Sequence, residues 1–396
     1  MELNYREKMA QILEELAGGS RKRELRPSAP VGAMEVERDG RRLINFSSND
    51  YLGLARDPRL AAAAAEACRQ GVGATASRLV CGTFPLHHRL ELALAALKGT
   101  GAALVMGSGF QTNAGALAAL LDPEVAGSAP LVFTDRLAHA SMYEGLRVAG
   151  VRPVRFRHND LGHLRDLLDK HAGAEGFRMI LTESVFSMDG DRADLPGLIQ
   201  LARAHGAFLF VDEAHATGVL GPSGAGLCAE PGVKGQVDLV MGTFGKALGG
   251  YGAFVACEPM LQEWLVNRCR SFIYSTALPP PVAAAALRAL ELIPSLDARR
   301  ANLAAQSARA RAALHGLGID TLASDTQIIP AIIGADRETL AASRALEAQG
   351  ILAVAIRPPT VPPGTGRLRL TLTAAHSAAD IDQLIQAFQA LGRAGA

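Results

Sequence analysis

The sequence is short of several features that would restrict what the protein can be. It has five cysteines among 396 residues, an odd number without a Cys-x-x-Cys pair, which argues against a disulfide framework and a zinc site. We therefore expect reduced, mostly buried thiols, as in a cytoplasmic protein, and no metal. The formal net charge is +1, so no strong electrostatic field attracts nucleic acid or an anionic membrane.

Long apolar runs are missing as well. No uncharged apolar stretch reaches the ~18 residues that span a bilayer. Residues 1–8 lack the apolar core of a signal peptide. We expect no membrane partner. The composition, 49% hydrophobic and 20% charged, is that of a globular protein, and the length favours two or three structural units.

Short apolar runs alternate with helical patterns through the middle of the chain. The strand candidates are 102–106, 131–134, 154–156, 179–182, 207–211, 239–241 and 253–257. Runs that are apolar on both faces and separated by helices indicate a buried, mainly parallel sheet. The sequence therefore predicts an α/β fold with a seven-stranded, mainly parallel sheet covered by helices on both faces.

The two ends of the chain have other patterns. Apolar residues at helical spacing predict a helix over 7–17, and a long helix is expected over 282–316. The last part predicts a strand, a helix over 338–349, a strand over 351–356, a half-buried strand at 368–372 and a helix capped by Ser377. We expect three divisions: an N-terminal helix and extended segment (1–50), a large α/β domain (51–285) and a smaller α+β domain (286–396).

Lys246 stands in a glycine-rich segment, 242–250, directly after a predicted strand. A second strand, 207–211, is followed by Asp212 and, three residues later, by His215. Ligands of open α/β sheets collect outside the carboxyl ends of the strands. These features together indicate a lysine that forms a Schiff base, with an acid placed to serve a cofactor ring. The alternative is a surface lysine, although few of those sit among so many small residues.

Asp212 ends an apolar strand, where a carboxylate without a partner is costly to bury. A protonated pyridine nitrogen would be such a partner, and the pairing would keep the ring able to accept electrons. The alternative is a carboxylate that is hydrogen-bonded to the next loop.

The segment 107–110 lies between a strand and a predicted helix over 111–121, where backbone N–H groups can bind an anion. A dinucleotide fingerprint needs Gly or Ala where Thr112 stands, and a Walker loop needs Ser or Thr where Ala247 follows Lys246. A single phosphate is therefore favoured over the dinucleotide of an oxidoreductase. An ordinary tight turn remains the alternative.

Two further polar residues follow strand ends. His139 comes after the strand 131–134, and its flat imidazole can stack on a planar ring; a buried core histidine is the alternative. Ser187 comes after the strand 179–182. Near the N-terminus, the basic run 21–23 is interpreted from the residues alone as a solvated turn.

Four motifs carry a resemblance to a known family: 46–54 (FSSNDYLGL), 211–218 (VDEAHATG), 242–246 (GTFGK) and 274–276 (YST). From about residue 5 to 394 the chain resembles the α-oxoamine synthases, class-II aminotransferase-like enzymes of pyridoxal-phosphate (PLP) fold type I. The stretches 357–362 (RPPTVP) and 367–376 (RLRLTLTAAH) resemble the branch that condenses L-alanine with a pimeloyl thioester.

The resemblance implies roles for the matched residues. Lys246 would bind PLP as an imine and move the Cα proton, and Asp212 would pair with the ring nitrogen. The other cofactor contacts would be His215 and Ser187 at the phenolic oxygen, His139 on the ring face, Gly109, Phe110 and Thr243 at the phosphate, and Ser275 and Thr276 at the phosphate of a neighbouring subunit. The substrate contacts would be Asn49 and Arg369 at the amino-acid carboxylate, His139 lining the acyl site, and Arg21 and Thr360 facing the acyl substrate. The resemblance thus replaces the interpretation of the basic run 21–23 as a solvated turn by a role in substrate binding.

The implied enzyme is a homodimeric, cytoplasmic C-acyltransferase whose partners are L-alanine and a pimeloyl thioester of CoA or acyl-carrier protein. Glycine C-acetyltransferase and 5-aminolevulinate synthase share the cofactor residues and remain the alternatives within the family. A PLP-binding module without activity would be expected to lose Lys246 first. The segment 71–78 has fewer glycines than in some relatives, which leaves the acyl carrier open.

Overall fold

The computed structural model describes residues 4–127 and 129–394, and the chain divides into two compact units. Unit 1 comprises residues 1–49, 188–191 and 302–396, and unit 2 comprises residues 50–187 and 192–301. This division differs from the three expected segments, because residues 1–49 share a unit with the C-terminal residues and the later boundary falls after 301. The reason is that β3 (Arg41–Asn45) pairs in parallel with β12 (Ile351–Leu352).

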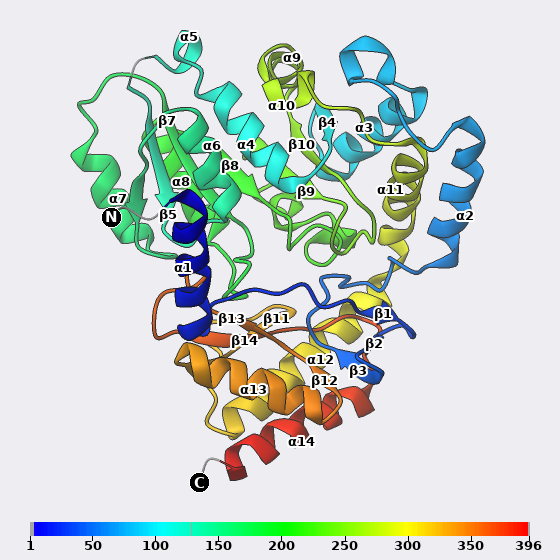
Figure 1. The fold of residues 1–396 in the computed structure, drawn as a ribbon. Coiled ribbons are helices and arrows are strands. Elements are labelled where there is room, and N and C mark those ends of the chain that lie inside the picture. The colour runs from blue at the N-terminus through cyan, green and yellow to red at the C-terminus, as the bar shows by residue number, and fades with distance from the viewer. Residues whose placement is uncertain (1–3, 128, 395–396) are drawn as a thin grey trace. The chain divides into compact units, whose positions relative to one another are not determined.

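Unit 2 is built on a seven-stranded sheet with the order β4-β10-β9-β8-β7-β5-β6 (Figure 1). Its strands are β4 (Ala102–Met106), β5 (Leu131–Asp135), β6 (Val154–Phe156), β7 (Arg178–Glu183), β8 (Phe208–Asp212), β9 (Leu239–Thr243) and β10 (Ala253–Cys257). Strand β10 is antiparallel to both of its neighbours, and the other neighbouring pairs are parallel. The predicted mainly parallel sheet is confirmed, with each strand within two residues of its expected bounds.

Helices cover this sheet. Their bounds are α2 (Pro58–Ala67), α3 (Pro85–Lys98), α4 (Gly109–Leu120), α5 (Pro123–Ala126), α6 (Ala140–Val148), α7 (Leu161–Lys170), α8 (Leu195–Ala204), α9 (Pro259–Arg268), α10 (Arg270–Ile273) and α11 (Pro280–Leu292). Every residue of β4 and β10 is buried, which requires cover on both faces of the sheet. The core beneath α4 and α6 includes Phe210, Met241 and Leu117.

The strand directions decide where the functional side chains lie. Strands β4, β5, β7, β8 and β9 run the same way, so their carboxyl ends meet at one edge of the sheet. The residues that end these strands or closely follow them are Gly109, His139, Ser187, Asp212 and Lys246. The sheet therefore brings to one edge residues that are up to 137 positions apart in the chain.

Unit 1 contains two small sheets. The first has the order β1-β2-β3-β12 and the second the order β11-β14-β13. The remaining strands are β1 (Ala29–Pro30), β2 (Glu35–Arg38), β11 (Ile328–Gly334), β13 (Val354–Ile356) and β14 (Gly366–Thr371). The helices are α1 (Tyr5–Gly18), α13 (Asp336–Ala348) and α14 (Ala378–Ala394), while α12 (Asp297–Gly316) begins in unit 2 and continues into unit 1.

Three expectations for the C-terminal part were wrong in detail. The helix over 282–316 is broken between α11 and α12 by a 3-10 turn that contains Pro294, which cannot donate the helical hydrogen bond. The strand over 351–356 is two strands that belong to different sheets. Strand β14 is buried throughout rather than half-buried, because Arg367 and Arg369 are themselves hydrogen-bonded inside the unit.

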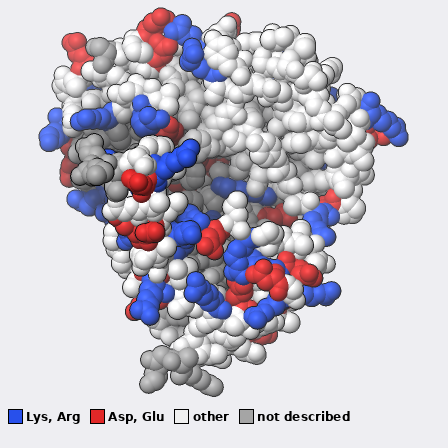
Figure 2. All heavy atoms as spheres, viewed as in Figure 1, with Lys and Arg blue, Asp and Glu red and all other residues white. Residues whose placement is uncertain are grey.

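The helices of the described ranges include none that combines the length and apolarity needed to cross a membrane. On the face seen in Figure 2, basic and acidic side chains are interspersed, in keeping with the net charge of +1.

Candidate active site

Lys246 is carried by a loop that is fixed close to the lysine. The Thr243 hydroxyl donates to the carbonyl oxygen of Gly252 at 2.8 Å and accepts from the backbone N–H of Gly245 at 3.1 Å. Gly249 has a φ of +65°, and a Cβ there would lie 2.4 Å from a backbone nitrogen of the segment before α2. Glycine is therefore required at this turn, and the predicted glycine-rich loop has a structural reason.

The Lys246 amine is hydrogen-bonded to a histidine. Its Nζ lies 2.7 Å from Nε2 of His215, and Nδ1 of the same ring lies 2.6 Å from the Tyr51 hydroxyl. An ammonium group can only donate, so His215 accepts at Nε2 and its Nδ1–H donates to the Tyr51 oxygen. Both His215 and Tyr51 are buried. A buried hydrogen-bonded chain thus orients the lysine amine.

Asp212 ends β8 and is buried, with 4% of its surface exposed. One carboxylate oxygen accepts from the amide of Asn113 at 2.8 Å, and the other accepts from the backbone N–H of Ala214 at 2.8 Å. The bond to Ala214 is the loop contact that was considered as the alternative. It uses only part of the carboxylate, which can accept about four hydrogen bonds.

The Asn113 amide also links Asp212 to the expected ring-stacking histidine. The amide nitrogen donates to the Ser141 hydroxyl at 2.9 Å, and the Ser141 oxygen lies 2.7 Å from Nδ1 of His139. Since the serine oxygen accepts from Asn113, its proton points to Nδ1, and the proton of a neutral His139 lies on Nε2. His139 is therefore bound in one tautomer.

The pKa of His139 is lowered from its usual value. Desolvation by the surrounding protein is the main cause, the Asp212 carboxylate opposes it and the Lys246 charge adds to it, although His139 is exposed in the single chain. The neutral ring is the form that can accept the Ser141 proton, so the hydrogen-bond geometry and the pKa agree.

Ser187 follows β7, and its backbone N–H donates to the Glu183 carboxyl at 3.2 Å. Glu183 is 2% exposed, and burial, with the nearby Asp212 charge, raises its pKa well above the usual value. Its second oxygen has no hydrogen-bond partner among residues 4–127 and 129–394. The Glu183 carboxyl, whose pKa is raised by burial, thus positions the start of the Ser187 loop through this hydrogen bond.

Gly109 and Phe110 form the first turn of α4, which Ser108 caps by accepting from the backbone N–H of Gln111 at 3.3 Å. The first N–H groups of a helix have no intrahelical acceptor and favour an anion. The Gln111 amide donates to the Ser275 hydroxyl of the same chain at 3.0 Å. Ser275 therefore lies beside the same turn as Gly109, while Thr276 forms a β-bridge with Ser77.

The predicted substrate residues lie in unit 1. The Asn49 side-chain oxygen accepts from the Arg369 guanidinium at 3.0 Å, so the structure brings these two together. Arg21 forms an ion pair with Asp336 at 2.8 Å. Arg21 and Thr360 share no direct bond, but both line one cavity of about 610 Å³.

Four residues of the site were not predicted from the sequence: Tyr51, Asn113, Ser141 and Glu183. Each acts through a hydrogen bond to a predicted residue, and of these four only Glu183 ends a strand, β7. A weak signal existed for Asn113, which stands one helical turn after Gly109, and for Ser141, two residues after His139.

The model of the aminotransferase class I and II family matches residues 41–388. The chain belongs to the class I and II aminotransferase family. Within this family, the protein is 56% identical over 383 residues, or 96% of each chain, to a putative 8-amino-7-oxononanoate synthase of Bordetella pertussis. It is 53% identical over 384 residues, again 96% of each chain, to the 8-amino-7-oxononanoate synthase of Gluconacetobacter diazotrophicus.

Solved structures of similar proteins agree with this fold. Serine palmitoyltransferase of Sphingomonas wittichii is 32% identical, with a TM-score of 0.91 over 100% of this chain and 99% of that chain. The structure of the 8-amino-7-oxononanoate synthase of Francisella tularensis supports the fold. It is 24% identical, with a TM-score of 0.74 over 89% of this chain and 97% of that chain. The predicted fold class and the resemblance drawn from the motifs are confirmed.

Proposed function

We propose that the protein condenses L-alanine with a pimeloyl thioester, in a PLP-dependent reaction that gives 8-amino-7-oxononanoate, carbon dioxide and a free thiol. Relatives named for this activity are 53% and 56% identical over nearly the whole chain. The structural observation that carries the proposal is the meeting of two networks at one sheet edge, Lys246 with His215 and Asp212 with Asn113.

The residues at this edge fit PLP. Asp212 is a buried carboxylate with capacity left for a protonated ring nitrogen. The first turn of α4 suits one phosphate, and Lys246 supplies the amine that holds the cofactor. A serine palmitoyltransferase that is 32% identical has been solved with PLP. When bound, PLP supplies an electron sink for the carbon next to an amino group.

Lys246 is the group that we propose moves protons. Its Nζ would take the Cα proton of alanine and later return a proton to the product. Nε2 of His215, 2.7 Å away, orients the amine, and the Tyr51 hydroxyl holds that imidazole from its other side. Because His215 and Tyr51 are buried, the lysine works against a fixed partner rather than against water.

His139 would stack on the cofactor ring and line the acyl site. Its Nδ1 is occupied by the Ser141 hydroxyl, so Nε2–H is the donor that it can offer a substrate. Ser187 would donate to the phenolic oxygen of the cofactor, with its loop set by Glu183. Thr243 shapes the lysine loop and would also lie near the phosphate.

The substrate groups would be bound by unit 1. The planar fork of Arg369, held by Asn49 at 3.0 Å, suits the carboxylate of alanine. Arg21 and Thr360, which line one cavity, would face the acyl substrate.

We also propose a cytoplasmic homodimer, in which Ser275 and Thr276 reach the phosphate of the neighbouring subunit. Sedimentation equilibrium of the PLP-loaded protein should give twice the chain mass of 41.5 kDa. A monomer with full activity would contradict this part of the proposal.

The test of the activity is a panel of substrates. The PLP-loaded protein should release thiol fastest with L-alanine and a pimeloyl thioester, and the product should have the mass of 8-amino-7-oxononanoate. Faster turnover with glycine and acetyl-CoA would favour glycine C-acetyltransferase, and with glycine and succinyl-CoA 5-aminolevulinate synthase. No turnover with any pair would favour a binding module.

A further inference from the structure

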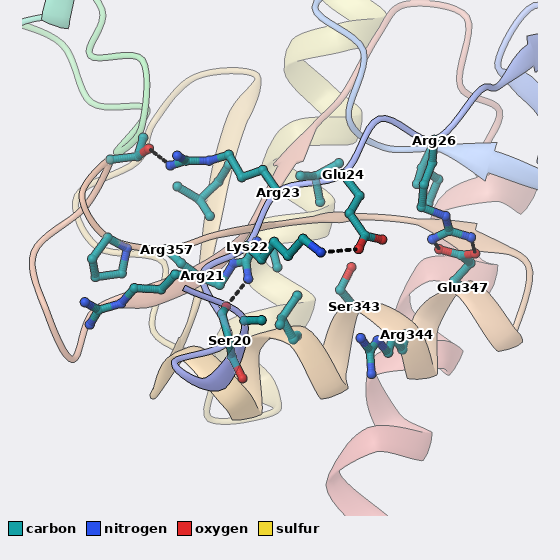
Figure 3. Close-up of a pocket in the computed structure, with 18 of the residues that line it drawn as sticks. Ser20, Arg21, Lys22, Arg23, Glu24, Arg26, Ser343, Arg344, Glu347 and Arg357 are labelled. Atoms are coloured by element: carbon teal, nitrogen blue, oxygen red, sulfur yellow. Dashed lines mark hydrogen bonds and ion pairs between the residues drawn. The ribbon is translucent and has the colours of Figure 1, made fainter. Parts of the chain in front are cut away.

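The cavity in unit 1 is lined by ten uncharged residues, two acidic residues and seven basic side chains (Figure 3). They come from the segment after α1, from β2, from α13 and from the residues around β13. The basic members are Arg21, Lys22, Arg23, Arg26, Arg38, Arg344 and Arg357, and the acidic members are Glu24 and Glu347. The volume of about 610 Å³ falls within the range of ligand sites.

Some of these charges are neutralised by acids. Arg26 forms a bidentate pair with Glu347, with distances of 2.6 and 2.9 Å, and Arg38 lies 3.8 Å from the same carboxylate. Arg21 pairs with Asp336 at 2.8 Å. Lys22 lies 4.0 Å from the exposed Glu24.

Three arginines that line the cavity are not paired with a carboxylate of the described residues. Within the described part of the chain, Arg23, Arg344 and Arg357 form no ion pair. The Arg23 guanidinium contacts the Thr360 hydroxyl at 3.5 Å, which is a neutral partner. Three positive charges around one cavity are therefore left without a counter-charge from these residues.

Arg357 is the least satisfied of the three. One of its terminal nitrogens donates to the carbonyl oxygen of Ser20, while its Nε is buried and has no acceptor among the described residues. Burial and the neighbouring Arg23 charge lower its pKa, the Asp336 charge opposes them, and the Arg344 charge adds to the lowering. A guanidinium that is partly desolvated beside two like charges is destabilised until an anion binds.

We propose that Arg23, Arg344 and Arg357 form a binding site for organic phosphate, which takes the phosphate groups of the thioester's carrier. The existence of the anion site follows from these three arginines, whereas the identity of the carrier rests on the proposed function. CoA carries a diphosphate and a 3'-phosphomonoester, and the phosphopantetheine arm of an acyl-carrier protein carries a phosphodiester, so both carriers offer phosphate oxygens.

The number of charges favours phosphate over the distal carboxylate of a pimeloyl chain. A carboxylate carries one negative charge and would leave two of the three guanidinium charges uncompensated. CoA carries several phosphate charges, and arginine binds phosphate oxygens through paired N–H groups.

The test compares three pimeloyl thioesters that share the pantetheine arm: those of CoA, which adds a diphosphate and a 3'-phosphorylated adenosine, of phosphopantetheine, which adds one phosphate, and of pantetheine, which has none. Their KM values are measured with the PLP-loaded wild type, with Arg23→Gln and Arg344→Gln, and with Arg337→Gln as a control. Arg23 and Arg344 are exposed, so their replacement should not affect folding. Arg337 is an exposed arginine of the same helix as Arg344 that does not line the cavity.

We expect each cavity substitution to raise KM for pimeloyl-CoA roughly three- to tenfold, the effect of one charge-assisted contact near the surface. The kcat, the KM for alanine and the KM for the pantetheine thioester should stay unchanged, and Arg337→Gln should behave as wild type. An equal effect on the phosphopantetheine thioester assigns the site to that phosphate, and an effect on CoA alone assigns it to the nucleotide phosphates. Unchanged KM values, or an equal rise for the pantetheine thioester, would overturn the proposal.

A binding measurement separates this proposal from the proposed activity. Calorimetric titration of the PLP-loaded protein with CoA should show binding that Arg23→Gln and Arg344→Gln weaken. If this occurs without turnover of any thioester, the phosphate site stands and the proposed activity fails. If wild type and variants bind CoA equally while turnover is normal, the phosphate site fails and the activity stands.

Discussion

Nζ of Lys246 lies 2.7 Å from Nε2 of His215, and the other nitrogen of that ring is held by the Tyr51 hydroxyl at 2.6 Å. Lys246 follows β9, His215 follows β8 and Tyr51 precedes α2, so three separate segments fix one amine. A lysine that must both hold a cofactor and move a proton benefits from this restriction, because its amine is oriented before the substrate arrives.

Replacing Tyr51 by phenylalanine removes the hydroxyl and keeps the ring. We expect kcat to fall roughly two- to tenfold, since one hydrogen bond contributes about 0.5–1.5 kcal/mol. The pH profile of kcat should shift, because Nδ1 of His215 loses its partner. Tyr143→Phe is the control: it removes a bond to the carbonyl oxygen of Asp135 and should leave the pH profile unchanged. A Tyr51→Phe enzyme with the wild-type kcat and pH profile would refute the role of this chain.

Asn113→Ala should weaken the retention of PLP. The amide donates to the Asp212 carboxylate, and a hydrogen bond to a charged group contributes about 1.5–3 kcal/mol, so dissociation should rise roughly 10- to 100-fold. The rate can be followed by the loss of PLP absorbance after dilution. Asn302→Ala, at an asparagine that bonds to Ala374, should retain the cofactor as the wild type does. Equal retention in the two variants would contradict the link between Asn113 and the cofactor.

Glu183→Gln tests whether this buried carboxyl is neutral. Its folded pKa is raised, so above the unfolded pKa of about 4.3 the unfolded chain loses a proton that the folded chain keeps. Stability should therefore fall with rising pH in the wild type and less so in Glu183→Gln. In urea unfolding between pH 5 and 8, the free energy of unfolding of the variant should increase relative to that of the wild type as the pH rises. A difference between variant and wild type that stays constant over this range would mean that Glu183 is ionised in the folded protein.

His376 predicts the opposite dependence on pH. It is buried, stacks on Phe46 with ring centroids 4.2 Å apart, and has its pKa lowered to about 4 by burial. Below about pH 6.5 the His376 imidazole binds a proton in the unfolded chain but stays neutral in the folded chain. The free energy of unfolding therefore falls by up to about 3 kcal/mol by pH 4. His376→Asn should remove this loss, whereas His88→Asn, at an exposed histidine, should not. An equal loss of unfolding free energy at low pH in the wild type and in His376→Asn would contradict the lowered pKa of His376.

The sheet and the outline of the site could both be predicted from the apolar runs of the sequence. Apolar runs between helical patterns indicate buried parallel strands, and such strands place Asp212 and Lys246 at one edge. The side chains that support them could not be predicted, because Asn113 reaches Asp212 from another helix and no local pattern records that contact.

Unit 1 was harder to predict, because its pairings join distant segments. The strand predicted over 351–356 divides because Ile351 pairs with Ile44 while Val354 pairs with Arg369. The alternation in β14 suggests an exposed face, but Asn49 lies 320 positions away and hydrogen-bonds the buried Arg369. Alternation cannot reveal that a charged side chain has a partner elsewhere.

The most direct test of the central claim is multiple turnover by Lys246→Ala with L-alanine and pimeloyl-CoA, measured as carbon dioxide and free thiol released per active site. The wild type and Lys234→Ala, which removes an exposed lysine, should release both products in equal amounts over many cycles. Lys246→Ala should bind PLP but complete no repeated cycle, with a rate at least about 10³-fold lower, as expected when a covalent catalytic group is lost. Sustained release by a homogeneous Lys246→Ala protein would contradict the role assigned to this lysine.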